Sequence, residues 1–120
     1  MQDFKRLEVW QLAHKLSVKV YDIVETFPRD ELYGLRSQTT RAAGSIAANI
    51  AEGCGRGTAK AMSAFLDIAM GSAMELECHL LRARDRGFAP AESVEPFLTE
   101  VDRLQRMLAS LNRQVRKRAG

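Results

Sequence analysis

The chain of 120 residues has the length of one domain and is too short for two ordinary ones. Apolar residues make up 46% and charged residues 28%, a globular balance that excludes a disordered chain. Two cysteines are too few for a disulfide scaffold, and the net charge of +3 is only a mild basic excess.

No apolar run approaches the roughly 20 residues that a membrane-spanning helix needs, and residues 1–10 lack the apolar core of a signal peptide. We therefore expect a cytoplasmic protein that does not associate with a membrane and whose two thiols are free. Cys78 is expected to be a small packing residue. Cys54 sits in a glycine-rich loop before a helix, where a thiolate could be stabilised.

Apolar residues spaced three and four apart predict a first helix over residues 3–27, with Asp3 as its N-cap. Pro28 ends this helix, because the residue before a proline is displaced from the α-helical region. The predicted buried stripe consists of Leu7, Trp10, Ala13, Leu16 or Ser17, Val20, Val24 and Phe27.

A second helix is predicted over residues 31–51, with Asp30 as N-cap and Gly53 as terminator. Small residues fill positions 42–48, which permits close approach by another helix. Gly44 in the middle of this stretch costs about 1 kcal/mol relative to Ala and needs such a compensation.

The third helix is expected to open after Thr58 and to run to about Arg86, with Gly87 as terminator. The fourth begins between Pro90 and Ser93 and runs to about Val115; Ser93 as N-cap would place Pro96 in the first turn. Its seam consists of Val94, Phe97, Val101, Leu104, Leu108, Leu111 and Val115. A basic tail over residues 113–120 follows. Short connections predict an all-α, antiparallel up-down-up-down four-helix bundle as one domain over residues 1–120.

Polar residues share one face on each of the two central helices. They are Gln38, Arg41, Ser45, Asn49 and Glu52 on the second, and Ser72, Glu75, His79, Arg82 and Arg86 on the third. Such faces can form a buried hydrogen-bonded network, a small-molecule site or a solvated surface. We predict a structural network of Arg41, Ser45, Asn49, Glu52, Ser72 and Glu75. Glu52 is expected to bind Arg41 or backbone donors of residues 53–57.

Catalytic and metal chemistry find little support in the pattern. Di-iron bundles use Glu-x-x-His motifs, and neither His14 nor His79 has a glutamate three residues before it. Glu75 and His79 share a helix face, but two ligands do not make a metal site. We predict no enzyme activity, no cofactor and no metal.

Two basic groups are candidates for binding an anionic partner. Residues 53–58 form a glycine-rich loop before a helix, and helix N-termini bind phosphates. Arg56 and Lys60 lie there, although a flexible connector is the favoured interpretation of this loop. The tail carries Arg113, Arg116, Lys117 and Arg118, which suit nucleic acid or simply a solubilising helix end.

One nonapeptide is specific. Residues 45–53 read S-I-A-A-N-I-A-E-G and resemble the S-I-x-x-N-I-A-E-G signature of the 23S rRNA-intervening-sequence proteins. The rest of the chain, from about residue 4 to residue 111, agrees in order. Its matching positions include Phe4, Leu7, Val9, Trp10, Ala13, Tyr21, Phe27, Pro28, Glu31, Gly34, Leu35, Gln38, Phe65, Leu66, Gly71, Ser72, Glu75, Leu76 and Glu77.

The resemblance implies a four-helix bundle that assembles into a ring, commonly a pentamer, without enzymatic activity. Some members are encoded within insertions in 23S rRNA genes. A related branch, the accessory variability determinants of diversity-generating retroelements, binds nucleic acid and a reverse transcriptase through a basic surface.

Three hypotheses follow. The first is a homo-oligomeric scaffold that binds RNA or a ribonucleoprotein; the second is an oligomeric protein-interaction module without nucleic acid; the third is a ligand-binding or metal-using bundle. The physical argument for assembly is that apolar residues off the main stripes would be exposed in one bundle. These are Leu12, Ile68, Met70 and Leu81.

Overall fold

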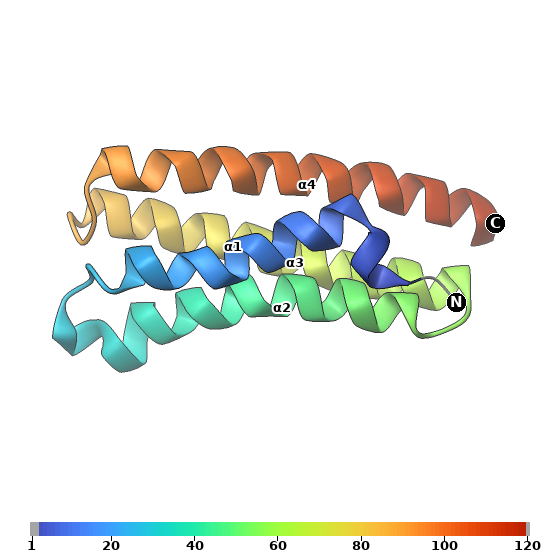
Figure 1. Ribbon diagram of the computed structural model, residues 1–120, viewed down its shortest axis with the longest axis horizontal. Coiled ribbons are helices and arrows are strands. Elements are labelled where there is room, and N and C mark those ends of the chain that lie inside the picture. Colours follow the sequence, from blue (N-terminus) through green and yellow to red (C-terminus); the bar gives the residue numbers. More distant parts are fainter. Residues whose placement is uncertain (1–2, 120) are drawn as a thin grey trace.

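Four long helices dominate the computed structural model, which describes residues 3–119 (Figure 1). They are α1 (Glu8–Val24), α2 (Ser37–Cys54), α3 (Ala59–Asp85) and α4 (Ala91–Ala119). The described part of the chain contains no strand, so the predicted all-α class is confirmed. The course of the colours in Figure 1 shows that consecutive helices run in opposite directions, as their short connections require.

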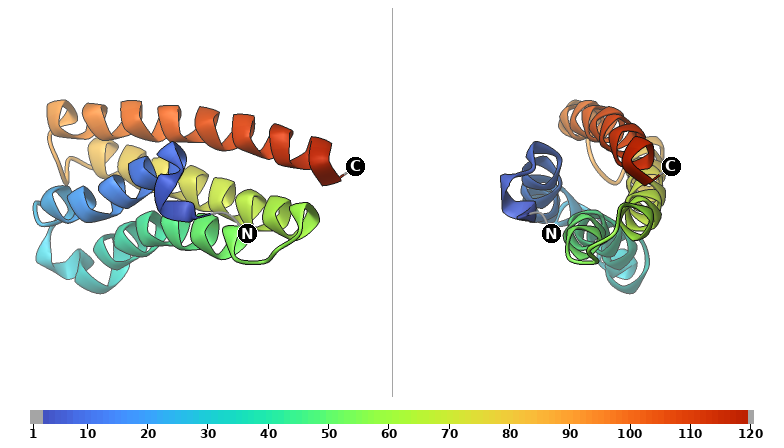
Figure 2. Two further views of the ribbon diagram at one scale, coloured as in Figure 1. Left: turned by 45° about the vertical axis from the view of Figure 1, so that its right-hand side comes forward. Right: turned by 90° about the vertical axis from the view of Figure 1, so that its right-hand side faces the viewer.

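The helices stand at the four corners of an elongated bundle, whose longest axis measures 46 Å. Helices α1 and α3 each pack against both α2 and α4, and therefore lie at diagonal corners (Figure 2). Within residues 3–119, none of the helices combines the length and the apolar character that a membrane crossing requires.

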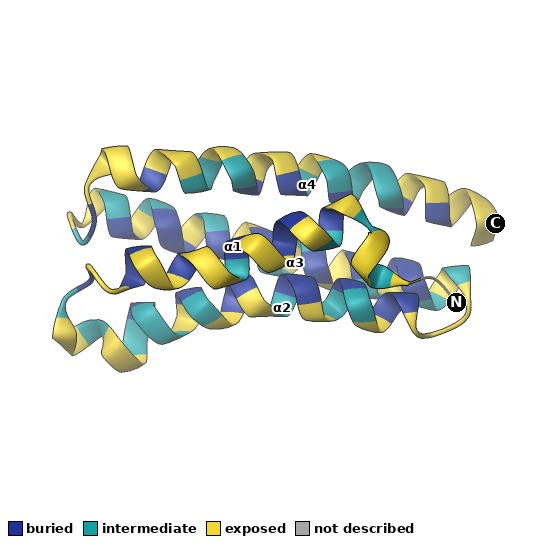
Figure 3. Ribbon diagram, viewed as in Figure 1, coloured by how far each residue is buried: buried dark blue, intermediate teal, exposed yellow. Residues whose placement is uncertain are grey.

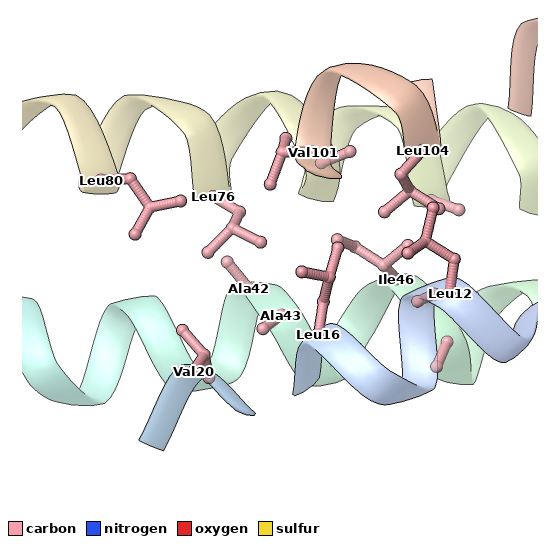
Figure 4. Packing of buried hydrophobic residues seen from close by; sticks show 14 of the residues in the cluster. Leu12, Leu16, Val20, Ala42, Ala43, Ile46, Leu76, Leu80, Val101 and Leu104 are labelled. Carbon is pink, nitrogen blue, oxygen red and sulfur yellow. The ribbon is translucent and has the colours of Figure 1, made fainter. Parts of the chain in front are cut away.

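The core is aliphatic and runs along the whole bundle axis. Buried residues lie on the inward faces and exposed residues on the outward faces of all four helices (Figure 3). In Figure 4, Leu16 of α1 points toward Ile46 of α2, while Leu76 of α3 lies above Ala42. Each fully buried Leu or Ile stabilises the fold by about 1.5–3 kcal/mol, so this stripe supplies most of the stability.

The start of the chain differs from its prediction. Asp3 accepts a hydrogen bond from the Lys5 backbone N–H at 3.1 Å, but it caps a short 3₁₀ turn (Phe4–Arg6) rather than α1. Leu7 is extended, so α1 begins only at Glu8. This break rotates the buried face: Val9 is buried, and so is Leu12, which was expected to be exposed.

The entry to α2 is also irregular. A 3₁₀ turn (Arg29–Glu31) leads into a π-helical turn (Leu32–Arg36), in which Gly34 has non-helical angles of φ −101° and ψ −109°. The side chain of Glu31, rather than the predicted Asp30, accepts a hydrogen bond from the Leu35 backbone N–H at 3.1 Å. The predicted continuous helix from residue 31 is therefore wrong, because local periodicity does not reveal the kink at Gly34.

Gly53 does not terminate α2, which continues to Cys54 with Gly55 as its C-cap. Gly53 is buried against α3: a Cβ atom there would lie 3.0 Å from the Phe65 Cβ and 3.3 Å from the Met62 carbonyl oxygen. Gly44 behaves in the opposite way. It is exposed, with no atom within 4 Å of a Cβ position, so no helix of the same chain compensates its cost.

The boundaries of α3 follow the prediction. Thr58 accepts a hydrogen bond from the Ala61 backbone N–H at 3.1 Å, and Gly87 takes up the positive φ of 73° that glycine favours. α3 ends at Asp85, one residue before the expected end.

The fourth helix starts within the predicted range and is longer than predicted at its C-terminal end. It begins at Ala91, so Pro96 falls in the second turn rather than the first. It then continues through the expected basic tail to Ala119 and buries Val115 completely. Residues 113–119 are thus part of the bundle; residue 120 of the predicted tail lies outside the described residues.

The two glycines of α2 predict opposite effects of the same substitution. Gly53→Ala should destabilise by about 1–3 kcal/mol, because the added methyl group is forced into α3. Gly44→Ala should stabilise by up to about 1 kcal/mol, because the methyl group meets nothing and the helix propensity improves. Urea unfolding followed by circular dichroism measures both. Equal effects of the two substitutions would contradict the close α2–α3 contact at Gly53.

Candidate nucleic-acid interface and polar clusters

The structure brings the two predicted basic groups to one end of the bundle. The C-terminal end of α4 and the connection between α2 and α3 lie at the same end (Figure 1). A cavity of about 360 Å³ spans them. Its lining consists of Gly53, Cys54, Gly57, Thr58, Ala59, Met62 and, from α4, Arg118. Five cations lie at this end, and we call them the basic end: Arg56, Lys60, Arg113, Lys117 and Arg118.

The cations of the basic end differ in how they are engaged. Arg56 forms an ion pair with Glu52 at 2.9 Å and stacks over the Phe65 ring at 4.9 Å from its centroid. Lys60, Arg113, Lys117 and Arg118 are exposed, and among residues 3–119 no ion pair or hydrogen bond involves their side chains. Their charges therefore face solvent and are free to meet an anionic partner.

Arg116 was expected to bind nucleic acid, but its guanidinium is turned toward α3. It donates to the Asp67 carboxylate at 2.8 Å and to the Ser63 hydroxyl at 3.1 Å. Asn112 lies in the same cluster: it accepts from Ser63 at 2.6 Å and donates to Asp67 at 2.8 Å. Ser63 and Asn112 are buried. Because their polar groups are paired, this cluster fixes α4 on α3 at low cost.

The sequence analysis missed Ser63, Asp67 and Asn112. The spacing of the buried residues of α4 held a signal: Leu104, Leu108, Asn112 and Val115 follow steps of four, four and three, whereas the predicted Leu111 is only partly buried. A polar residue at a core position of a helix demands a partner on a neighbouring helix.

The predicted polar network forms only in part. The Ser45 and Ser72 hydroxyl oxygens are 2.9 Å apart, and Asn49 donates to the Ser45 carbonyl oxygen at 2.8 Å and to its hydroxyl at 3.0 Å. Arg41 and Glu75 line a polar cavity of about 220 Å³ beside this cluster, together with Gln38, Ala42, Ser45 and Ser72. Glu52 does not bind Arg41 or the loop backbone; its partner is Arg56, one helical turn away.

His79 is the one buried side chain in the described residues that has an unsatisfied polar atom. Its Nε2 lies 3.1 Å from a Glu75 carboxylate oxygen, whereas its Nδ1 has no partner. Glu75 and His79 are thus neighbours, as their spacing predicts. Within residues 3–119, no group of three or more His, Cys, Asp or Glu side chains is placed to hold a metal ion.

The two cysteines exchange their expected environments. Cys78, predicted to pack inside, is exposed, and Cys54 is buried. Burial raises the pKa of the Cys54 thiol above its ordinary value, and the charge of Asp3 raises it further. The loop therefore does not stabilise a thiolate, and Cys54 is protonated at neutral pH.

Polar clusters join α2 to α3 and α3 to α4, and four exposed cations at one end of this small helical bundle remain without a partner among the described residues. The sequence profile of the 23S rRNA-intervening sequence protein family matches residues 5–110, and the chain belongs to this family. Its signature residues 45–53 lie in α2 along the contact with α3. No curated protein sequence matches the chain.

Asn49 belongs to the polar network and Glu52 does not, which predicts different losses of folding stability for two alanine substitutions. Asn49→Ala should lower stability by about 1–3 kcal/mol, because it removes both hydrogen bonds from Asn49 to the half-buried Ser45, whose hydroxyl then keeps only Ser72. Glu52→Ala should cost no more than about 1 kcal/mol, because its ion pair with Arg56 is exposed. Thermal or urea unfolding of the two variants decides; a larger cost for Glu52→Ala would contradict this assignment.

The raised pKa of Cys54 predicts a slow thiol. In a Cys78→Ser chain, Cys54 should react with Ellman's reagent at pH 8 at least about tenfold more slowly than in the urea-unfolded chain, because burial blocks access and lowers the thiolate fraction. The rate in the folded chain should continue to rise above the ordinary pKa of a thiol, because the pKa of Cys54 is raised. Equal rates in the folded and unfolded chains would show that Cys54 is accessible.

Proposed function

We propose that the protein is a non-enzymatic, homo-oligomeric scaffold that binds RNA or a ribonucleoprotein through the basic end of its bundle. The observation that carries this proposal is the convergence of two basic segments, about fifty residues apart in the sequence, at one end. Four of the cations there have no partner among the described residues, and exposed Lys and Arg are the side chains that neutralise phosphates.

Assembly strengthens what one chain offers. A single chain with four available cations would bind RNA weakly, but an oligomer repeats them once per chain. Several weak contacts on one strand then multiply through the effective concentration. Binding of this kind follows the phosphate backbone and is largely independent of the base sequence.

Exposed apolar side chains support assembly, although not the ones expected. Leu12 is buried, and Met70 and Leu81 are only partly exposed, so the sequence argument holds for Ile68 alone. The large hydrophobic residues that are exposed in the structure are Val18, Tyr21, Leu32, Tyr33, Ile68 and Met74. Clusters of such residues in water commonly mark interaction surfaces.

A protein-interaction module without nucleic acid is the second candidate. Tyr33 is 91% exposed, and its neighbour Leu32 is also exposed. They lie in the π-helical turn before α2, at the end of the bundle that is remote from the basic end (Figure 1). An exposed aromatic residue beside an aliphatic one is a common anchor for a protein partner.

Truncation cannot test the basic end, because residues 113–119 include the buried Val115 and the bridging Arg116. Reversal of two exposed charges, Lys117→Glu with Arg118→Glu, avoids this problem. We expect at least a tenfold loss of RNA affinity at low salt. The slope of log affinity against log salt should become shallower by about 0.7–0.9 for each phosphate that the variant no longer neutralises. Filter binding of a structured RNA at two salt concentrations measures both.

The matched control is Arg103→Glu with Arg106→Glu, which changes the net charge equally on an exposed stretch of α4 away from the basic end. It should retain most of the affinity. An equal loss in both variants would mean that only net charge matters. Absence of binding by the parent protein at low salt would defeat the nucleic-acid proposal and favour the interaction module.

A further inference from the structure

The polar cavity between α2 and α3 shares no residue with the basic end. It measures about 220 Å³ and is lined by Gln38, Arg41, Ala42 and Ser45 of α2 and by Ser72 and Glu75 of α3. We call it the α2–α3 cavity. Pockets for drug-sized ligands begin at roughly 300 Å³. The α2–α3 cavity is smaller, so a ligand that fits it is a small molecule.

The α2–α3 cavity is lined by two opposite charges that do not pair with each other. Among residues 3–119, no ion pair or hydrogen bond involves the Arg41 side chain. The Glu75 carboxylate is engaged by His79 of its own helix, at 3.1 Å from Nε2. A cavity with one cation and one anion is complementary to a ligand that carries both charges itself. The carboxylate of such a ligand would meet Arg41, and its ammonium group would meet Glu75.

His79 makes Glu75 different from an ordinary surface glutamate. The residue is only 8% exposed, and its Nδ1 atom has no hydrogen-bond partner among the described residues. With Nε2–H donating to Glu75, Nδ1 is an unprotonated acceptor, and a buried acceptor without a partner lowers stability. The fold thus retains an unfavourable buried group whose polar contact holds a carboxylate at the α2–α3 cavity. Such local exceptions to good packing are typical of binding sites.

The register of the two helices places His79 at one end of the α2–α3 cavity. Ser45 faces Ser72, with their hydroxyl oxygens 2.9 Å apart. Because α2 and α3 are antiparallel, Gln38, two turns before Ser45, lies at the level of His79, two turns after Ser72. The serine pair therefore closes the other end of the cavity.

The neutral part of the lining is small and polar. The two serine hydroxyls and the Gln38 amide offer hydrogen bonds, while the buried Ala42 supplies the one apolar side chain of the lining. The lining contains neither an aromatic nor a long aliphatic side chain. It therefore suits a ligand with little apolar surface.

We propose that the α2–α3 cavity binds a small zwitterionic amino acid. The Arg41 guanidinium receives the carboxylate, for which its planar fork is suited. Glu75, positioned by His79, accepts hydrogen bonds from the ammonium group, and the hydroxyls of Ser45 and Ser72 surround the remaining atoms. This site is separate from the basic end, so its occupation does not require RNA.

The two histidines of the chain allow the site to be observed directly. His79 contacts Glu75, whereas His14 stacks on Trp10 of α1 and serves as the internal control. The protein is titrated with glycine, L-alanine, L-serine and 4-aminobutyrate, and the imidazole ¹⁵N signals are recorded by NMR. At least one of these probes should shift the His79 signal saturably and leave the His14 signal unchanged. Acetate and methylammonium should bind at least about tenfold more weakly, because each lacks one of the two charged hydrogen-bonding groups.

Substitutions of the two charged residues test the assignment of each half. In calorimetric titrations, Arg41→Gln and Glu75→Gln should each weaken binding of the amino acid at least about tenfold, and Arg41→Lys should restore part of the affinity. The matched control is Arg103→Gln on α4, at the corner diagonal to α2, and it should bind like the parent. Circular dichroism should show unchanged folding of the Arg41 variants, because Arg41 is exposed.

Three results would each overturn this proposal. One is the absence of a saturable His79 shift with all four probes. Another is equal affinity for acetate or methylammonium alone, and the third is an affinity that Arg41→Gln leaves unchanged. None of these results bears on RNA binding, which filter binding measures at the basic end.

Discussion

Small side chains let α2 and α3 approach closely, and the rest of the bundle is organised around that contact. Gly53 leaves room for the Phe65 Cβ, and the hydroxyl groups of Ser45 and Ser72 come within 2.9 Å of each other. On the other side of the same stretch, Ile46 and Ile50 are fully buried. The family signature at residues 45–53 is thus explained by packing: it combines two core residues with the small and polar residues that fit α3.

A second interhelical cluster extends this order to α4. Ser63 and Asp67 of α3 hold Asn112 and Arg116 of α4, so the last turns of α4 are held against the start of α3. One arginine is thereby used for architecture. The cations beside it, Arg113 and Lys117, are four residues apart, share one exposed face and stay in solvent. The same helix therefore supplies a structural bridge on the face toward α3 and a charged surface on the face toward solvent.

The sequence predicts those features that depend on neighbouring residues. Thr58 and Gly87 bound α3 because a cap and a positive φ are local requirements. The kink at Gly34 and the break at Leu7 escape prediction, because periodicity continues through them. The roles of Arg116 and Glu52 escape for different reasons. Asp67 lies 49 residues before Arg116 and is its neighbour only in the fold. Arg56 lies only four residues after Glu52, but the predicted helix ended before it, whereas α2 continues past Gly53 and brings the two side chains together.

The small net charge of the chain is the sum of separated regions, and their separation decides what the molecule attracts. At physiological ionic strength, charges in water are screened over about 8 Å, whereas the bundle is 46 Å long. Glu75 and Glu77, in the middle of α3, therefore do not cancel the cations at the basic end. A polyanion would meet attraction at that end and repulsion along the α3 flank. Binding of a polyanion would therefore be confined to the basic end, although the net charge of the whole chain is small.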